Sequence, residues 1–450
     1  RPNSWPRSTR RPPLCTPPGA HTHDRHDRAL RPDRRAEFAR LHPNDERNRD
    51  RAMRTLHFPL RSADFQAPAA LSGLASRALV IGAVGAAASI AGFLLAPQEF
   101  FEAYLVGWLL WYTVAVGALG FLMLQHLSGG GWGLAARRIL ESAGRTIPFV
   151  GIAAIPLFLG LDKIFIWADP AKVAVDHALQ HKAPYLNAPF FIARTIFAIG
   201  LFSFYAYYLS AKSKRQDETG DPSLKAKMHD VSAVGLLLYL IVNTFMGFDW
   251  LMSLDPHWFS SLYGAIFVSG EALAGMTFII LIANWLRQRE PMDAIFSRKL
   301  FHDYGKLLFA YVMFWTYLTI SQFIIMWQGN LPEEAVWFQV RFHGGWGYVA
   351  AGLLIFHFFF PFLILLSRSV KEKAQALSAV AAFVLVMRWA DLVWLTRPTL
   401  REGGFSIHWL FAAIPVGIGG LWFYLFAREL GRRPLVAVND PQWKEVLGHD

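Results

Sequence analysis

The sequence predicts an all-α membrane protein that crosses the bilayer about ten times. The chain is 54% hydrophobic and only 17% charged, whereas a soluble domain carries about 25% charged residues. Its apolar residues gather in blocks of about 20 or more, which is enough to cross the hydrocarbon core at 1.5 Å per residue. The blocks are continuous rather than alternating, so helices are expected instead of barrel strands. A large soluble helical domain would show a polar stripe along each helix.

The first 52 residues differ from the rest of the chain. They contain 13 Arg, 8 Pro and 7 Asp or Glu. This stretch lacks the apolar core of a secretory signal and is too acidic for an Arg-rich transit peptide. We expect residues 1–52 to be disordered, and to be upstream sequence included by an over-extended start, because the first methionine is Met53. The alternative is a genuine basic tail.

The only cysteine, Cys15, also lies in that stretch. The remaining sequence therefore offers no disulfide, no thiolate-ligated iron–sulfur cluster and no c-type haem attachment site.

Ten apolar segments follow, and each predicts one membrane-spanning helix. They lie at 75–96, 103–127, 146–162, 187–211, 231–252, 258–286, 303–327, 343–367, 374–396 and 405–427. Together they form a transmembrane domain over 53–430, followed by a cytoplasmic tail at 431–450.

The basic residues set the predicted orientation. Between the spans, Lys and Arg number 23 in the segments on the side of Met53 and 6 in those on the other side. Basic residues are retained in the cytoplasm, so both termini are predicted to be cytoplasmic. The basic charge therefore reflects membrane topology, and no nucleic-acid partner is expected. The longest loops, 163–186 and 212–230, are too short to fold as domains, so any activity lies in the bilayer or with partner subunits.

Glu271 is the strongest candidate for a functional residue. An ionised side chain at the centre of a membrane helix costs about 2.5–3.5 kcal/mol on insertion scales. Glu271 is predicted near the middle of the sixth span, with no other acid or base within ten residues of it on that helix and with Gly270 and Gly275 beside it. Small neighbours allow close helix packing or room for water. Glu271 is either a proton carrier or a protonated group with one structural hydrogen bond.

The outer end of the fifth and sixth spans carries Asp249, Asp255 and His257. Asp255 with Pro256 predicts the N-terminal cap of the sixth span. Asp249 lies about one turn inside the outer end of the fifth span, and His257 is either an exposed surface group or one that titrates near neutral pH.

Spans eight and nine each carry polar residues at depth. His357 is expected near the middle of span eight, where it is a packing residue or a proton carrier. Haem b would need a second histidine at matching depth, and none is evident. Arg388 and Asp391 are spaced i, i+3 on span nine, so they can pair on one helix face and soften the cost of burial.

The inner end of span seven carries a third group, His302, Asp303 and Lys306. These residues predict either an entrance for protons or an interfacial charge cluster. With Glu271 and His357 in the middle, and Asp249, Arg388 and Asp391 placed toward the outside, titratable groups are available at every depth.

Two long motifs resemble one known family. FMGFDWLMSLDPHWFSSLYGAIFVSGEALAG, and then FHDYGKLLFAYVMFWTYLTISQFIIMWQGNLPEEAVWF, resemble the F subunit of bacterial alternative complex III. They resemble the NrfD-like membrane subunits of polysulfide reductases more distantly. The resemblance extends over about 60–435 and does not include residues 1–52.

The resemblance implies two NrfD-like four-helix bundles with flanking helices, in a bacterial inner-membrane complex that oxidises menaquinol or ubiquinol. In such a complex, haem c and iron–sulfur subunits carry electrons to a cytochrome c or a terminal oxidase. A paralogous membrane subunit binds the quinol. This chain would bind no cofactor or metal itself.

The sequence therefore favours a proton-conducting membrane subunit, with Glu271, His357, Asp249, Asp391, Arg388, His302, Asp303 and Lys306 as the candidate path. The first alternative is that Asp249, His257 or Asp391 accepts quinol protons in a site on this chain. The second is a scaffold whose buried charges only pair with each other. A secondary transporter is less favoured, because no span is clearly broken by paired Gly or Pro at mid-depth.

Overall fold

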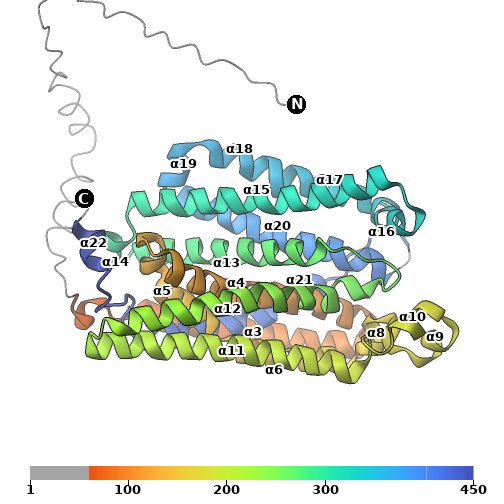
Figure 1. Cartoon of the computed structure of the whole chain (residues 1–450), viewed down its shortest axis with the longest axis horizontal. Helices are drawn as coiled ribbons and strands as arrows, with labels where there is room; N and C mark the ends of the chain where they lie inside the picture. The colour runs from red at the N-terminus through yellow and green to blue at the C-terminus, as the bar shows by residue number, and fades with distance from the viewer. Residues whose placement is uncertain (1–59, 402, 449–450) are drawn as a thin grey trace, which may run out of the picture. The chain divides into compact units, whose positions relative to one another are not determined.

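The computed structural model describes residues 60–401 and 403–448, and these residues form helices with no β-strand (Figure 1). Ten helices are long and apolar enough to cross a membrane. The all-α polytopic fold predicted from the sequence is thus confirmed. Residues 1–52, predicted to be disordered, lie outside the described part.

The ten spans are built from thirteen α-helices and one π-helical segment. They are α3 (Ala69–Leu95), α4 (Pro97–Ser128), α5 to α7 (Gly131–Gly144, Ile147–Ile152, Ile155–Leu159), α11 (Ala188–Thr219), α12 (Ser223–Trp250), α13 (Tyr263–Arg287), α15 (Arg298–Gly329), α17 with the π-segment and α18 (Trp346–Leu353, Leu354–Phe359, Phe360–Leu366), α20 (Ala374–Leu400) and α21 (Leu410–Leu430).

The connecting elements gather at two opposite ends of the bundle (Figure 1). The predicted cytoplasmic end carries α14 (Met292–Ile295), α19 (Arg368–Glu372) and α22 (Trp443–Gly448). The predicted outer end carries α8 (Leu161–Ile164), α9 (Pro170–Val175), α10 (His177–Lys182) and α16 (Pro332–Phe342). Successive connections therefore alternate between the ends, as expected of a multi-span chain.

Two predicted span boundaries were wrong for identifiable reasons. The third span begins at Gly131 instead of 146, because ion pairs bury Arg137, Arg138 and Glu141 in a helix too polar to be recognised by hydropathy. The sixth span begins at Tyr263 rather than at Asp255 and Pro256, which lie in the turn before it. Asp255 is therefore not its N-cap, a position that Leu262 occupies without a side-chain bond.

We divide eight of the spans, in chain order, into two groups of four. The first group contains α4, α5–α7, α11 and α12, and the second contains α13, α15, α17–α18 and α20. The two groups meet where α4 packs against α13. In the most apolar stretch of α4, 94% of the residues are buried, against 22% in α3. Helix α4 is therefore at the centre of the fold.

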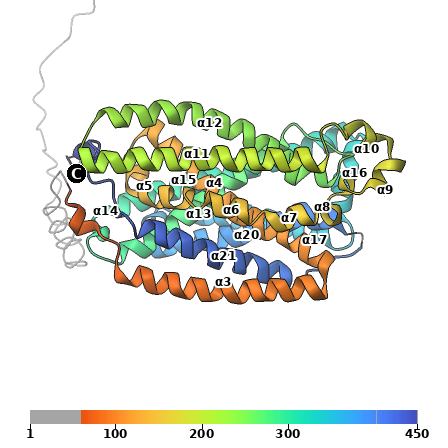
Figure 2. The ribbon, with the colours of Figure 1, turned by 90° about the horizontal axis from the view of Figure 1, so that it is seen from below.

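Helices α3 and α21 form an outer pair that packs on α4, on the opposite side from α11 and α12 (Figure 2). Their backbones nearly touch: a Cβ added to Gly85 would lie 2.2 Å from the Cα of Gly417, and one added to Gly420 would lie 2.4 Å from the nitrogen of Gly82. Small residues at a helix crossing permit such close packing in membranes.

The chain beyond α21 folds back over the predicted cytoplasmic end. Leu435, Val436 and Val438 are buried, and the Leu435 N–H donates to the Phe65 carbonyl. Arg137 pairs with Asp440 at 2.7 Å, with both side chains almost fully buried. The predicted tail is thus, in its described part, an ordered segment fastened to α5.

The α3–α21 crossing gives a test of the packing. Gly85→Val should destabilise the purified protein by roughly 1–3 kcal/mol, because the added methyls have no space against Gly417. Gly73→Val on the same helix is the matched control, since nothing lies within 4 Å of a Cβ there. The loss of monodisperse protein after heating in detergent measures both. Equal melting of the two variants would contradict the close crossing.

Candidate functional site

Helix α12 turns one polar face into the protein. Ser232, Tyr239, Asn243 and Asp249 lie on α12, Ser253 lies just beyond it, and all five are buried. They follow one another over 21 residues, or about 31 Å at helical rise. This distance is close to the thickness of a bilayer's hydrocarbon core. We refer to these five residues as the α12 polar face.

The inner and middle residues of the α12 polar face bond to two neighbouring helices, α4 and α13. Ser232 Oγ lies 3.0 Å from His126 Nδ1 on α4. The Tyr239 hydroxyl donates to Glu271 Oε2 on α13 at 2.5 Å. Asn243 Oδ1 accepts from the Tyr112 hydroxyl at 2.6 Å. The face therefore holds hydroxyl, imidazole, carboxyl and amide groups in sequence.

The outer part of the α12 polar face holds Asp249. Arg194 on α11 binds both Asp249 oxygens, from Nε at 2.6 Å and from Nη2 at 3.0 Å. A two-pronged contact of this kind is among the strongest side-chain interactions. The same guanidinium lies 3.9 Å from the Tyr185 ring centroid. Asp249 is thus a fully paired carboxylate.

Tyr185 lies beside this ion pair, just before α11. Burial, followed by the neighbouring Asp249 carboxylate, raises the pKa of Tyr185 to about 12. Its phenol therefore keeps its proton at neutral pH.

Glu271 stands where the two four-helix groups meet. It is the ninth of 25 residues in α13, about 12 Å from the predicted outer end and so not at the middle of its helix. Its side chain is completely buried, and Oε1 has no hydrogen-bond partner among the described residues. The small neighbours predicted to allow close packing do so: a Cβ on Gly275 would lie 2.9 Å from the Gly117 carbonyl carbon of α4.

Arg388 and Asp391 form the ion pair that their spacing predicts. Arg388 is the fifteenth of 27 residues in α20, so the pair lies near mid-helix instead of toward the outside. The guanidinium lies against Gly270, where an added Cβ would be 2.3 Å from Cζ. It is close enough to act electrostatically on Glu271. Nε and Nη2 of Arg388 have no partner among the described residues.

His357 lies in the π-helical segment Leu354–Phe359, at mid-span. Pro361 follows, and a proline cannot donate to the carbonyl four residues earlier, which belongs to His357. Such π-segments are frequent at functional sites. The imidazole lies on Trp315 of α15 with ring centroids 4.1 Å apart. Within the described chain, neither of its buried nitrogens has a hydrogen-bond partner.

The structure separates the remaining candidates from this centre. Asp303 and Lys306 pair at 3.1 Å beside His302, at the predicted inner end of α15, and no described hydrogen bond joins them to Glu271. His257 lies at the outer end, where Nε2 is 2.7 Å from Asp176 Oδ2. No group of three or more His, Cys, Asp or Glu suitable for a metal ion occurs in the described residues.

Among the residues of the site that were missed in the sequence are His126, Ser232, Tyr239, Asn243 and Tyr112. Three of them do leave a signal: Ser232, Tyr239 and Asn243 are spaced i, i+7 and i+11, which places them on one face of an otherwise apolar helix. Tyr112 and His126 leave none, because only the fold brings α4 beside α12.

The pairing of His257 and Asp176 gives a test of pH dependence. The backbone N–H of Leu179, and after it the His257 ring, hold the pKa of Asp176 below its usual range. The carboxylate therefore stabilises the start of α10 above that usual range, and this stabilisation is lost as the pH falls through the lowered pKa.

The measurement is hydrogen exchange of the amides of α10, corrected for the intrinsic effect of pH. We expect wild-type protein to be better protected than Asp176→Asn at pH 6, and the difference to shrink as the pH falls below the usual pKa range of aspartate. A difference that grows on acidification would contradict the assignment.

No protein-family model matches the chain, and no curated protein is significantly similar to it. The buried polar geometry and the motifs of the sequence are therefore the observations that bear on function.

Proposed function

We propose that this chain is a redox-inactive membrane subunit of a bacterial quinol-oxidising complex of the alternative complex III kind, and that it conducts protons along the α12 polar face. Its place would be the inner membrane, beside a paralogous quinol-binding subunit, haem c and iron–sulfur subunits and, in some assemblies, a terminal oxidase. Menaquinone or ubiquinone would react on the paralogous partner. The motif resemblance supports the partners, and the buried geometry supports the conduction.

The observation that carries the proposal is the setting of Glu271. One carboxyl oxygen is held by Tyr239, and the other has no partner in the described structure. Leaving a buried polar atom unpaired costs about 1–3 kcal/mol. A purely structural glutamate would gain by satisfying both oxygens, whereas a group that receives and releases protons needs one of them free.

The route would begin at His126 and Ser232, pass Tyr239 and Glu271, and continue to Asn243 and Tyr112. The gap from Ser232 to Tyr239 is about 10 Å along the helix axis and that from Asn243 to Asp249 about 9 Å. Protons would cross these gaps through water, which bridges polar groups nearly as well as a direct bond. On the inner surface, protons would be collected from water by His302, Asp303 and Lys306.

Arg388 would control whether Glu271 is ionised or protonated. It is paired with Asp391 through one nitrogen while two others remain free beside Gly270. When Glu271 is ionised, the guanidinium stabilises the negative charge, and when Glu271 is protonated, Asp391 alone balances Arg388. Quinol oxidation in the partner would act by shifting this balance.

The alternative of quinol oxidation on this chain has less support. Its three candidate proton acceptors are already engaged: Asp249 with Arg194, His257 with Asp176, and Asp391 with Arg388.

The first test uses the complex isolated through a tag on this chain, in which haem c and iron–sulfur subunits should copurify. In vesicles, Glu271→Gln and Tyr239→Phe should lower proton translocation per electron to background, because a route that lacks one positioned proton-transfer group should conduct protons roughly 10²-fold more slowly. Tyr205→Phe is the control, since Tyr205 packs on Gly235 of α12 but bonds to no residue of the route. Unchanged translocation in Glu271→Gln, or a chain that purifies alone, would refute the proposal.

The second test separates conduction from a scaffold role. Asp391→Asn leaves Arg388 uncompensated and should cost about 3–5 kcal/mol, so the complex should assemble poorly. The double variant Arg388→Met with Asp391→Leu removes both charges and should restore assembly. We expect the assembled double variant to oxidise quinol with a lowered proton yield. A normal yield would leave the pair with a scaffold role only.

A further inference from the structure

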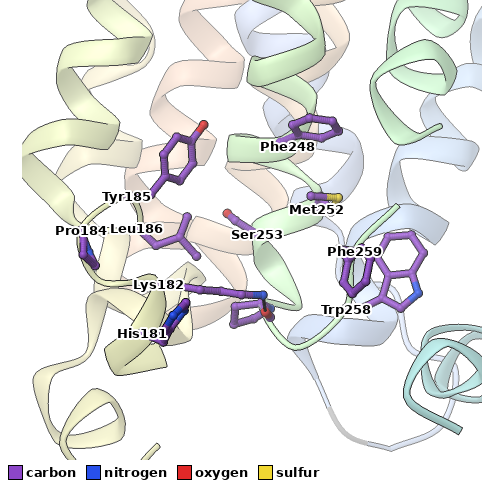
Figure 3. Close-up of a pocket in the computed structure, with 11 residues that line it drawn as sticks. His181, Lys182, Pro184, Tyr185, Leu186, Phe248, Met252, Ser253, Trp258 and Phe259 are labelled. Atoms are coloured by element: carbon purple, nitrogen blue, oxygen red, sulfur yellow. Dashed lines mark hydrogen bonds between the residues drawn. The ribbon is translucent and has the colours of Figure 1, made fainter. Parts of the chain in front are cut away.

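A pocket of about 350 Å³ opens at the predicted outer end of the first helix group (Figure 3). It lies between the segment that joins α10 to α11 and the turn that follows α12. Its lining residues are His181, Lys182, Pro184, Tyr185, Leu186, Phe248, Met252, Ser253, Pro256, Trp258 and Phe259. Of the α12 polar face, only Ser253 lines it, and Glu271 and Tyr239 do not.

The pocket has basic residues at one end and a mainly apolar wall elsewhere. His181 and Lys182 lie together at one end, whereas Leu186, Phe248 and Met252 line the remainder beside Tyr185 and Ser253 (Figure 3). Such a gradient suits an amphipathic ligand, whose charged part stays near water and whose apolar part enters the bilayer.

Lys182 is a positioned cation. Its Nζ donates to the Pro256 carbonyl, which fixes the ammonium at the pocket and leaves two further N–H donors. The nearby carboxylates are occupied, since Asp249 is bound by Arg194 and Asp176 by His257. Asp255 precedes Pro256 but does not line the pocket. The positive charge of Lys182 is therefore available to an anion.

The pocket lies at the predicted outer end of the spans, where lipid head groups are expected. In its wall Phe259 is 64% exposed, whereas Trp258 is buried against Trp337. On the bilayer side of the pocket, Phe245 of α12 and Phe190 of α11 are 47% and 45% exposed. These faces of the two helices are therefore open to lipid chains.

We propose that this pocket binds one anionic phospholipid of the outer leaflet, with its phosphate on Lys182 and His181 and its first acyl carbons between Leu186, Phe248 and Met252. The cationic rim favours an anion over an uncharged ring such as a quinone. The lipid would join the α10–α11 segment to the α12 turn, and so brace the outer end of the bundle. This inference does not depend on proton conduction.

The test uses the full chain in its isolated complex, in nanodiscs that contain phosphatidylglycerol with a photoreactive group on the first acyl carbons. Illumination should label peptides within 181–186 and 248–259. Lys182→Gln should reduce that labelling about fivefold, the effect of one basic residue at an anionic lipid surface. Lys172→Gln is the control, because Lys172 is exposed in the same outer segment and does not line the pocket.

A second variant tests the apolar part of the pocket, so that the proposal does not depend on the folding of Lys182→Gln alone. Met252→Trp fills the apolar part without touching the charge, and it should also reduce the labelling while the complex keeps its subunits. Inorganic phosphate should not compete, because it lacks the acyl chain. Equal labelling in Lys182→Gln and Lys172→Gln, equal labelling by phosphatidylethanolamine, or displacement by decylubiquinone would each overturn the proposal. The last outcome would assign the pocket to a quinone.

Discussion

The hydrogen bond between Tyr239 and Glu271 is the interaction on which the centre of this protein depends. It joins α12 of the first helix group to α13 of the second, at the level where Gly117 of α4 lets the α13 backbone approach closely. A carboxyl group in hydrocarbon needs a donor, and the phenol supplies one without adding charge. The same bond draws the two groups together, so the position of Glu271 and the interface between the groups cannot be altered separately.

Other buried charges form ion-pair clusters at the two ends of the helices. At the predicted inner end, Arg137 and Arg138 are paired with Asp440, Glu141 and Asp217, and at the outer end Arg397 is paired with Glu99 and Glu102. These clusters fasten the ends of the helices. Unpaired buried atoms occur in these end clusters too, among them Arg138 Nε, Glu141 Oε1 and Asp217 Oδ1. The centre differs in another way, because the Glu271 carboxyl is hydrogen-bonded to a phenol instead of to a cation.

Much of the fold could be read from the sequence, because hydrocarbon admits few backbone structures. The ten spans follow from apolar length, and the Arg388–Asp391 pair follows from spacing on one helix. The boundaries failed where tertiary ion pairs bury a polar helix, as in α5. Only part of the site could be predicted from the sequence. Glu271 and His357 are recognisable as titratable groups in apolar runs, but Tyr239 and Tyr112 resemble ordinary membrane aromatics. Packing between helices brings these two hydroxyls to hydrogen-bond partners that the sequence does not reveal. In the same way, the partner of Asp249 is Arg194, which lies 55 residues away in the sequence.

The segment after α21 has a consequence for biosynthesis. Arg137 enters the ribosome's product some 300 residues before Asp440, its counter-ion. Until Asp440 is made, the described partners of the Arg137 guanidinium are the amide oxygens of Gln125 and Gln216. A chain cut short before Asp440 would leave this buried guanidinium without its counter-ion, which is strongly destabilising.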